Sequence, residues 1–337
     1  MKKLLTELDA IYIQSLSNLF YFSKYKSADA KILITKDSDY YFTDARYFEE
    51  VENLPFVIKN ISDFYVFLKN EKIENLGTDL SISIDEYELL QKYGIKTVKN
   101  VSSYIQNKRS VKTDEEIRFI EKAQSITDKT FSDVLGSIKE GMTERELDSI
   151  LKSLLYKNGA EGLAFDPIVA FGKNTSKPHA HPGDNVLSCG DFITLDFGAS
   201  YNSYCSDMTR TVAFGKPTEE MVKIYNYVLE SQNKAIDALH AGIIGKDAQK
   251  IVEDYFTERG VREYFTHSLG HSLGIDIHEN PNLSAKNALP IPEGCVTSVE
   301  PGLYFPQKFG VRIEDIVVFL KNGVKNLTNS PKKLIII

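Results

Sequence analysis

The chain has 337 residues, of which 42 % are hydrophobic and 26 % charged, and this balance excludes a disordered chain and a peptide-sized scaffold. Its 40 Lys and Arg against 47 Asp and Glu give a formal net charge of -7, so no basic field is available to attract a nucleic acid. We find neither a signal-peptide core nor an apolar run of the roughly 18 residues that a membrane span needs. We therefore expect a cytoplasmic protein without a membrane partner.

Residues 1–112 combine short strand-like segments with helical ones. The segments 32–35 and 40–42 flank a polar turn and predict a β-hairpin, and residues 85–92 predict a helix. The polar, basic stretch 106–112 precedes a long helical segment. We therefore expect a smaller α/β domain over residues 1–112, with a boundary at its end.

Residues 113–337 predict two successive units of similar plan. Capping-box signals at Thr113 and Thr143 open two amphipathic helices, and Thr218 and Asp247 begin a second pair. A β-rich segment follows each pair. This order favours an internal duplication of a helix–helix–sheet unit, and a chance similarity of helix lengths is the alternative. The expected fold class is α+β, with two pseudo-duplicated helix-sheet halves.

Four acidic residues lie in apolar, strand-like segments, and the two members of each pair can approach each other across a hairpin. The pairs are Asp196 with Asp207 and Glu300 with Glu314. Each acid taken alone is more often an exposed residue. Because buried carboxylates without partners cost free energy, two hairpins that present all four inward would need cations between them.

Histidines form the second part of this pattern, since all six follow Pro178 and three of them gather in residues 267–278, between the acidic hairpins. A lone histidine is usually structural, but His267, His271 and His278 together are harder to explain in that way. Four carboxylates with the His271 imidazole are a mostly hard ligand set, which suits divalent ions such as Mn²⁺. Two such ions about 3.5 to 4 Å apart could hold a hydroxide nucleophile, so hydrolysis is the expected reaction.

Three motifs are distinctive in combination, namely residues 206–211 (SDMTRT), 300–304 (EPGLY) and 310–315 (GVRIED). Together they resemble the pita-bread metallopeptidases, specifically the proline-specific branch that contains aminopeptidase P and prolidase. Residues 12–21 and 43–47 resemble the creatinase-type N-terminal domain of that branch. The resemblance implies a pita-bread catalytic domain over residues 113–337, preceded by a creatinase-like N-terminal domain over residues 1–112.

The resemblance also implies a complete ligand set for two divalent metal ions per chain. Asp196 would bind the first ion, and Asp207 and Glu314 would bridge both. His271 and Glu300 would complete the coordination of the second. Mn²⁺ is favoured, and Co²⁺ or Zn²⁺ are the alternatives.

Further roles in catalysis follow from the same resemblance. His179 matches a loop histidine that shuttles protons near the scissile bond, and the nearby His181 is an alternative for that role. His278 matches a residue that stabilises the tetrahedral oxyanion. Glu314 is also a candidate general base towards the bridging water.

His267 and Arg312 match positions that bind the proline side of the substrate. A guanidinium beside the metal site could orient a carboxylate through paired hydrogen bonds. An ion pair of Arg312 with Glu314 or Asp315 is the competing structural role.

Two positions depart from the family pattern, which usually has a small residue before the loop glycine and GHG at the ligand histidine. This chain has Phe171 before Gly172, and Ser272 after His271. We expect Phe171 to narrow the substrate channel and so to affect specificity.

The activity implied by the resemblance is hydrolysis of the Xaa-Pro peptide bond, which releases the N-terminal residue from peptides with proline in second position. A hydroxide that bridges the two metals would be the nucleophile. A prolidase restricted to Xaa-Pro dipeptides is one alternative, and a catalytically silent binding protein is another. Proline-containing peptides are the expected partners, and the family often forms a homodimer through the N-terminal domain.

Overall fold

The computed structural model describes residues 1, 3–27, 29–79 and 82–337. The chain divides into two compact units, Met1–Lys108 and Arg109–Ile337. Within the described ranges, no helix combines the length and the hydropathy that crossing a membrane requires.

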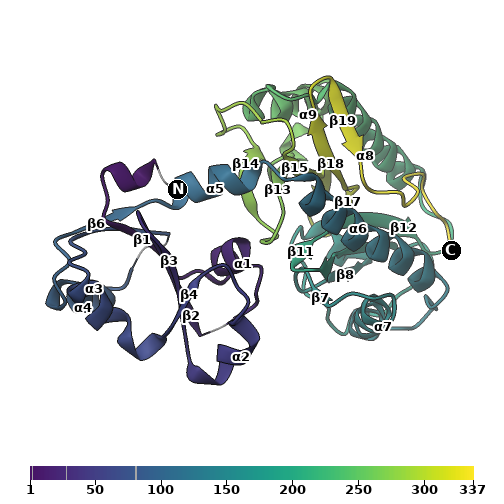
Figure 1. Ribbon diagram of the computed structural model, residues 1–337. Helices are drawn as coiled ribbons and strands as arrows, with labels where there is room; N and C mark the ends of the chain where they lie inside the picture. Colours follow the sequence, from purple (N-terminus) through teal and green to yellow (C-terminus); the bar gives the residue numbers. More distant parts are fainter. Residues whose placement is uncertain (2, 28, 80–81) are drawn as a thin grey trace. The chain divides into compact units, whose positions relative to one another are not determined.

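The first unit is built on a six-stranded mixed sheet in the order β4-β3-β2-β1-β5-β6 (Figure 1). Its strands are β1 Ala10–Ile13, β2 Ala30–Thr35, β3 Asp39–Thr43, β4 Val57–Asn60, β5 Asn75–Thr78 and β6 Thr97–Asn100. Its helices include α1 Leu16–Ser23, α2 Phe48–Val51, α3 Phe64–Asn70 and α4 Ile84–Lys92. The predicted hairpin is the antiparallel pair β2–β3, and the predicted helix is α4, so both expectations are confirmed.

The basic stretch 106–112 is partly helical, because helix α5 (Ser102–Ser110) runs into it. Two of its three cationic side chains, Arg109 and Lys112, are buried and both bond the carboxylate of Glu279, whereas Lys108 is exposed. The Lys112 Nζ to Glu279 Oε2 distance is 3.1 Å. A buried carboxylate needs such partners, so these two basic residues serve the packing of the second unit.

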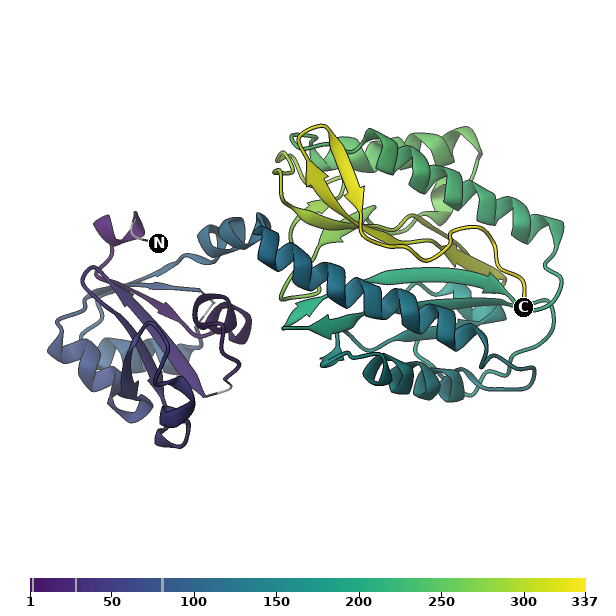
Figure 2. The same cartoon turned by 45° about the vertical axis from the view of Figure 1, so that its right-hand side comes forward.

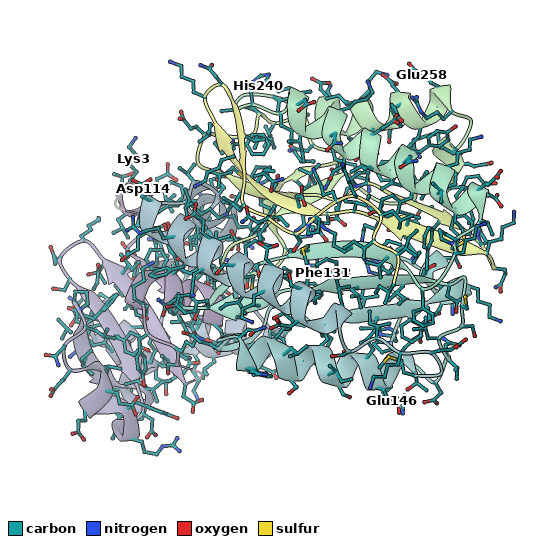
Figure 3. All side chains as sticks on the ribbon, turned by 90° about the vertical axis from the view of Figure 1, so that its right-hand side faces the viewer. Lys3, Asp114, Phe131, Glu146, His240 and Glu258 are labelled. Carbon is teal, nitrogen blue, oxygen red and sulfur yellow. The ribbon has the colours of Figure 1, made fainter. Side chains whose placement is uncertain are left out.

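The second unit contains two helix pairs, α6 Asp114–Leu135 with α7 Glu144–Lys157, and α8 Glu219–Ala238 with α9 Gly245–Glu258. Its larger sheets have the orders β12-β9-β8 and β14-β13-β15-β18-β19, and its smaller ones β11-β10-β7 and β16-β17. The strands are β7 Gly162–Leu163, β8 Ile168–Phe171, β9 Phe192–Phe197, β10 Ala199–Tyr201, β11 Tyr204–Cys205, β12 Met208–Ala213, β13 Gly270–Ser272, β14 Glu279–Leu283, β15 Val296–Val299, β16 Gly302–Phe305, β17 Phe309–Arg312, β18 Asp315–Leu320 and β19 Gly323–Asn326. Helices α7 and α9 lie on opposite sides of the strands, as Figure 2 shows and as Glu146 and Glu258 mark in Figure 3.

Each helix pair has its own apolar core against the strands. In the first half, Val134 of α6 and Leu151 of α7 pack with Leu195 of β9. In the second half, Val228 of α8 and Phe256 of α9 pack in a separate cluster with strand residues such as Val317. The two helix–helix–sheet halves that the sequence predicts are therefore present, in an α+β arrangement.

Three of the four helix starts agree with the local sequence signals. Thr113 and Thr143 form complete capping boxes, with Glu116 and Glu146 respectively, and Thr218 caps α8. The expected start of the fourth helix at Asp247 is wrong.

Helix α9 begins at Gly245, before Asp247, and no side chain caps its N-terminus. The backbone of a nearby loop takes over that role: the N–H of Gly245 donates to the carbonyl of Leu289 and that of Lys246 to Asn287. A Cβ at Gly245 would lie 2.5 Å from the carbonyl oxygen of Asn282. The helix extends to this point because glycine permits the close approach.

Candidate metal centre

Two antiparallel strand pairs bring the four predicted carboxylates to one place. In the first half, Asp196 of β9 lies opposite Thr209 of β12, and Asp207 directly precedes β12. In the second half, β15 pairs with β18, so that Glu300 directly follows one strand and Glu314 directly precedes the other. The hairpin geometry expected for both pairs is therefore present.

The carboxylates meet His271, which lies on β13 beside these strands. Ligand atoms of Asp207, His271 and Glu314 all lie within 4.8 Å of one another. His271 Nε2 is 3.5 Å from Asp207 Oδ2 and 3.4 Å from Glu300 Oε1. Asp196 lines the same cavity, which has a volume of about 340 Å³. All five predicted ligands therefore converge on one site.

Three carboxylate oxygens of this cluster take no part in the hydrogen bonds that the structure describes. Asp196 Oδ1, Asp207 Oδ1 and Glu314 Oε1 are buried and have no hydrogen-bond partner among the described residues. His271 Nδ1 lies 3.2 Å from the carbonyl of Ser272, which can only accept, so Nδ1 carries the proton and the Nε2 lone pair points at the carboxylates. Such an arrangement of acceptors is unfavourable unless cations lie between them.

The pKa values of the acids reflect the same crowding. Burial, reinforced by neighbouring carboxylates, raises the pKa of Asp207 and of Glu314 well above the ordinary range. Burial also raises the pKa of Glu300. Hard oxygen ligands with unpartnered lone pairs and a single imidazole fit divalent cations, and this observation indicates a metal-binding site.

Arg312 provides the principal cation facing this cluster. Its Nη2 donates to Asp196 Oδ2 at 2.6 Å, its Nη1 to the hydroxyl of Tyr304 at 2.7 Å, and its Nε to Thr209 Oγ1 at 2.9 Å. The ion-pair alternative expected from the sequence named the wrong partners, because Asp315 instead pairs with Arg210 at 2.7 Å. Strand β9 places Asp196 beside Arg312, and no local pattern reveals that contact.

Tyr304 joins Arg312 to His267. Burial raises the pKa of Tyr304 to about 12, so its hydroxyl stays protonated and can donate to His267 Nε2 at 2.9 Å. His267 Nδ1 in turn donates to the carbonyl of Ser268 at 2.8 Å. Burial lowers the pKa of His267, which favours this neutral tautomer. Tyr304 belongs to the motif 300–304, but the sequence did not predict that its hydroxyl would bond both Arg312 and His267.

The remaining predicted histidines differ in position. Both His179 and His181 are exposed, but only His179 lines the cavity. His278 also lines the cavity, with its ring centroid 4.4 Å from that of His271. Burial lowers the pKa of His278 and of His271. His179 and His278 therefore both lie at the cavity that the carboxylate cluster lines.

The two departures from the family pattern have structural explanations. Phe171 does not narrow the channel, contrary to expectation, because its side chain packs in the first-half core and is 3 % exposed. The cavity walls are instead formed by Phe165, Ile168 and Ile277. The Ser272 hydroxyl donates to the carbonyl of Pro281 and lies 3.1 Å from Cys295 Sγ. Ser272 thus fills a buried gap behind His271.

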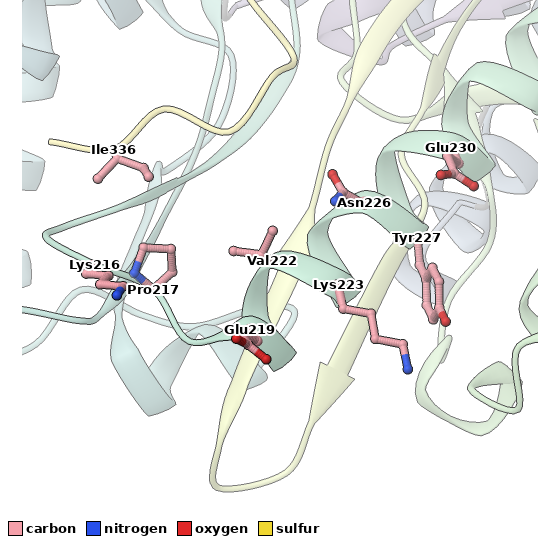
Figure 4. A pocket seen from close by; sticks show the side chains of 9 residues that line it. All are labelled: Lys216, Pro217, Glu219, Val222, Lys223, Asn226, Tyr227, Glu230 and Ile336. Carbon is pink, nitrogen blue, oxygen red and sulfur yellow. The ribbon is translucent and has the colours of Figure 1, made fainter.

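A second hollow of about 660 Å³ lies along the start of α8 and reaches Ile336 (Figure 4). Val222, Tyr227 and Ile336 give it apolar walls, and Lys223 and Glu230 give it charges of both signs. Its lining includes no histidine or cysteine. The chemical groups suited to catalysis are therefore gathered in the smaller cavity.

The two compact units and the buried cluster of carboxylates with a histidine are typical of metal-dependent hydrolases. The family comparisons narrow this class. The Creatinase/Prolidase N-terminal domain model matches residues 5–111, and the Metallopeptidase family M24 model matches residues 118–320. The chain belongs to metallopeptidase family M24.

Similar proteins cover nearly the whole chain. The Xaa-Pro dipeptidase of Pyrococcus horikoshii is 38 % identical over 334 residues, which are 97 % of this chain and 95 % of that protein. The structure of an Xaa-Pro dipeptidase from Bacillus anthracis has a TM-score of 0.96 and 34 % identity, and covers 100 % of this chain and 98 % of its own. The X-Pro aminopeptidase from Thermotoga maritima has a TM-score of 0.93, 33 % identity and coverages of 100 % and 99 %. The creatinase-type and pita-bread architecture expected from the motifs is thereby confirmed.

Proposed function

We propose that the protein is a metal-dependent hydrolase of the Xaa-Pro peptide bond. The observation that carries this proposal is the buried cluster of five proposed ligand residues, in which three carboxylates each have an oxygen without a hydrogen-bond partner among the described residues, beside a cavity large enough for a short peptide. The names of the similar dipeptidases and aminopeptidase supply the substrate class.

Asp196, Asp207, His271, Glu300 and Glu314 are the proposed ligands of two divalent metal ions, with Mn²⁺ favoured over Co²⁺ and Zn²⁺ for this oxygen-rich set. Such ions would polarise the scissile carbonyl and lower the pKa of a water molecule so that it can attack.

The residues around the ligands would then handle protons. Glu314 is the proposed general base, and the Thr209 hydroxyl holds its Oε2 at 2.7 Å, which fixes the orientation of the carboxylate. His179 would carry protons at the scissile bond, and His278 would donate a hydrogen bond to the developing oxyanion. Both line the cavity with the ligands.

His267 and Arg312 are the proposed contacts for the proline side of the substrate. Both line the cavity, and Tyr304 links them. Phe165, Ile168 and Ile277 offer apolar surface to the ring. A bond before proline has no N–H, so a site that acts on the carbonyl rather than on a backbone ladder suits this substrate.

Two substrate ranges are open within this activity. We propose an aminopeptidase that releases the residue before proline from longer peptides, and the alternative is a prolidase limited to Xaa-Pro dipeptides, which the names of the similar dipeptidases favour. Turnover of Xaa-Pro and of Xaa-Pro-Xaa tripeptides by the Mn²⁺-loaded protein separates them. Cleavage of both supports the aminopeptidase, and cleavage of dipeptides alone supports the prolidase.

A third outcome would overturn the enzyme proposal. If the purified protein binds less than one divalent ion per chain, cannot be loaded with Mn²⁺ and cleaves neither substrate, it is a silent binding protein. Elemental analysis of protein prepared without a chelator gives the metal content directly.

A further inference from the structure

A buried carboxylate outside the metal centre ties together both ends of the loop that carries His179. Glu144 is the first residue of α7 and is 0 % exposed. It does not line the cavity, and the function proposed above gives it no role. Every hydrogen bond found for its carboxylate among the described residues comes from an N–H of the segment 171–185.

The two oxygens divide this segment between them. Oε1 accepts from the backbone N–H of Phe171 and from Asn174 Nδ2, both at 2.8 Å, where the loop leaves strand β8. Oε2 accepts from the N–H of Gly183 at 2.9 Å and from Asn185 Nδ2 at 3.0 Å, where the loop returns. One side chain therefore clamps the entry and the exit of the loop.

An ionised carboxylate suits this position better than any neutral side chain. It offers only acceptors, and four N–H donors match its two oxygens without competition. Hydrogen bonds to a charged acceptor are also stronger than those to a neutral one. A glutamine of the same size would turn an NH₂ group towards one pair of donors, and so would weaken the hold on one end of the loop.

The tip of the clamped loop enters the metal centre. Pro178 and His179 line the cavity, and the carbonyl of Pro178 accepts from Arg312 Nη1 at 3.3 Å. The residues of the exit, 183–185, do not line the cavity. The position of the His179 imidazole in the cavity thus depends on how firmly the two ends of its loop are held.

We propose that Glu144 is a positioning residue, which acts through His179 by holding the loop 171–185 in its working conformation. This inference rests on the proposed function for its effect on turnover. Its effect on the loop itself can be measured without substrate.

The test compares Glu144→Gln with Glu146→Gln, a matched control in the same helical turn whose carboxylate serves only the exposed capping box. In Glu144→Gln, we expect faster amide hydrogen exchange in residues 171–185 and unchanged exchange in the helices. With an Xaa-Pro substrate, kcat should fall on the order of 10-fold to 100-fold, with a much smaller change in KM. Glu146→Gln should match the wild-type protein in both measurements.

A double-mutant cycle separates positioning from a general loss of structure. In a His179→Ala background, Glu144→Gln should change kcat by less than about 2-fold, because the group it positions is already gone. Equal losses of kcat with and without His179 would overturn the proposal, as would a Glu144→Gln protein with wild-type loop exchange and turnover.

Two outcomes need separate readouts. If Glu144→Gln does not fold, Asn185→Ala removes a single donor at an exposed residue, and it should give a smaller loss of kcat with the same dependence on His179. If the wild-type protein cleaves no Xaa-Pro substrate, the proposed function fails, and the exchange measurement still decides whether Glu144 holds the loop.

Discussion

The two halves of the second unit follow one order of elements, but they secure the loops around the metal centre in opposite ways. Helix α7 begins with Glu144, whose side chain reaches out to hold a loop. Helix α9 begins with Gly245, whose lack of a side chain lets a loop come close enough for backbone hydrogen bonds. The first residue of the second helix in each half thus holds a loop through a carboxylate in one half, and through the space left by a glycine in the other.

The halves also contribute different chemistry. The first supplies Asp196 and Asp207, and the second supplies His271 with Glu300 and Glu314. Duplication accounts for the converging strands, and the differences between the halves account for the mixed ligand set. Neither half alone supplies all five proposed ligands, so the proposed metal site needs both.

The largest effect is expected from removing one shared carboxylate of either half. Asp207→Asn and Glu314→Gln should each lower kcat on the order of 10²-fold to 10⁴-fold, because each removes a proposed bridging ligand and Glu314 is also the proposed base. Circular dichroism should show an unchanged fold. Asp254→Asn, on the exposed face of α9, is the control and should retain full activity. A large loss in only one of the two variants would contradict the equal need for both halves.

Divalent cations should change how stability depends on pH. In the metal-free protein, the pKa values of Asp207, Glu300 and Glu314 are raised in the folded state. The contribution of these groups to stability is therefore complete at low pH and is lost as pH rises through their folded pKa values. Mn²⁺ bound at the proposed site would offset this penalty by pairing the carboxylates, so it should raise Tm more at about pH 8 than at about pH 5.5.

Thermal unfolding with chelator or with excess Mn²⁺ checks this expectation, and a difference of roughly 5 °C or more is expected at the higher pH. Glu314→Gln lacks one of the crowded charges, so its metal-free form should lose less stability as pH rises. An equal effect of Mn²⁺ on Tm at both pH values would show that the cation binds elsewhere.

Local signals in the sequence predicted three of the four helix starts in the second unit, and the misses were contacts between distant segments. The capping boxes at Thr113 and Thr143 depend on residues three positions apart, so they could be identified directly. The pairing of Arg312 with Asp196 joins two different strands and could not. The start of α9 at Gly245 was missed because the groups that cap it belong to a loop far along the chain.

The candidate site divides in the same way. Its five ligands could be proposed because acids in apolar strands are unusual and the motifs around them are distinctive. The roles of Tyr304 and Glu144 could not be proposed from the sequence. A tyrosine in a strand and a glutamate at a helix start are both common, and only the folded chain shows their partners. Phe171 was assigned to the channel from its place before Gly172, whereas its side chain turns into the core.

A hydroxyl that joins the two halves should have an intermediate effect. Thr209 belongs to the first half, and its Oγ1 donates to Glu314 and accepts from Arg312 Nε, both of the second half. Thr209→Val keeps the shape but removes both bonds to charged groups, and kcat should fall on the order of 10-fold. Thr209→Ser keeps the hydroxyl and should retain most of the activity. Equal losses in both variants would mean that packing of the methyl group, rather than hydrogen bonding, is what matters.

The smallest expected effect is on the free energy of unfolding, and it tests the need for a glycine at the start of α9. In Gly245→Ala, the new Cβ would meet the backbone oxygen of Asn282, so the loop or the helix end must shift, at a cost of about 1–3 kcal/mol in the free energy of unfolding. Gly136→Ala is the matched control, because its backbone is helical and its Cβ would contact the protein only at 3.7 Å. Denaturant unfolding of both variants gives the comparison. If Gly245→Ala is as stable as Gly136→Ala, the loop adjusts freely, and the close approach of backbone does not hold the second half together in the way that the Glu144 carboxylate holds the first.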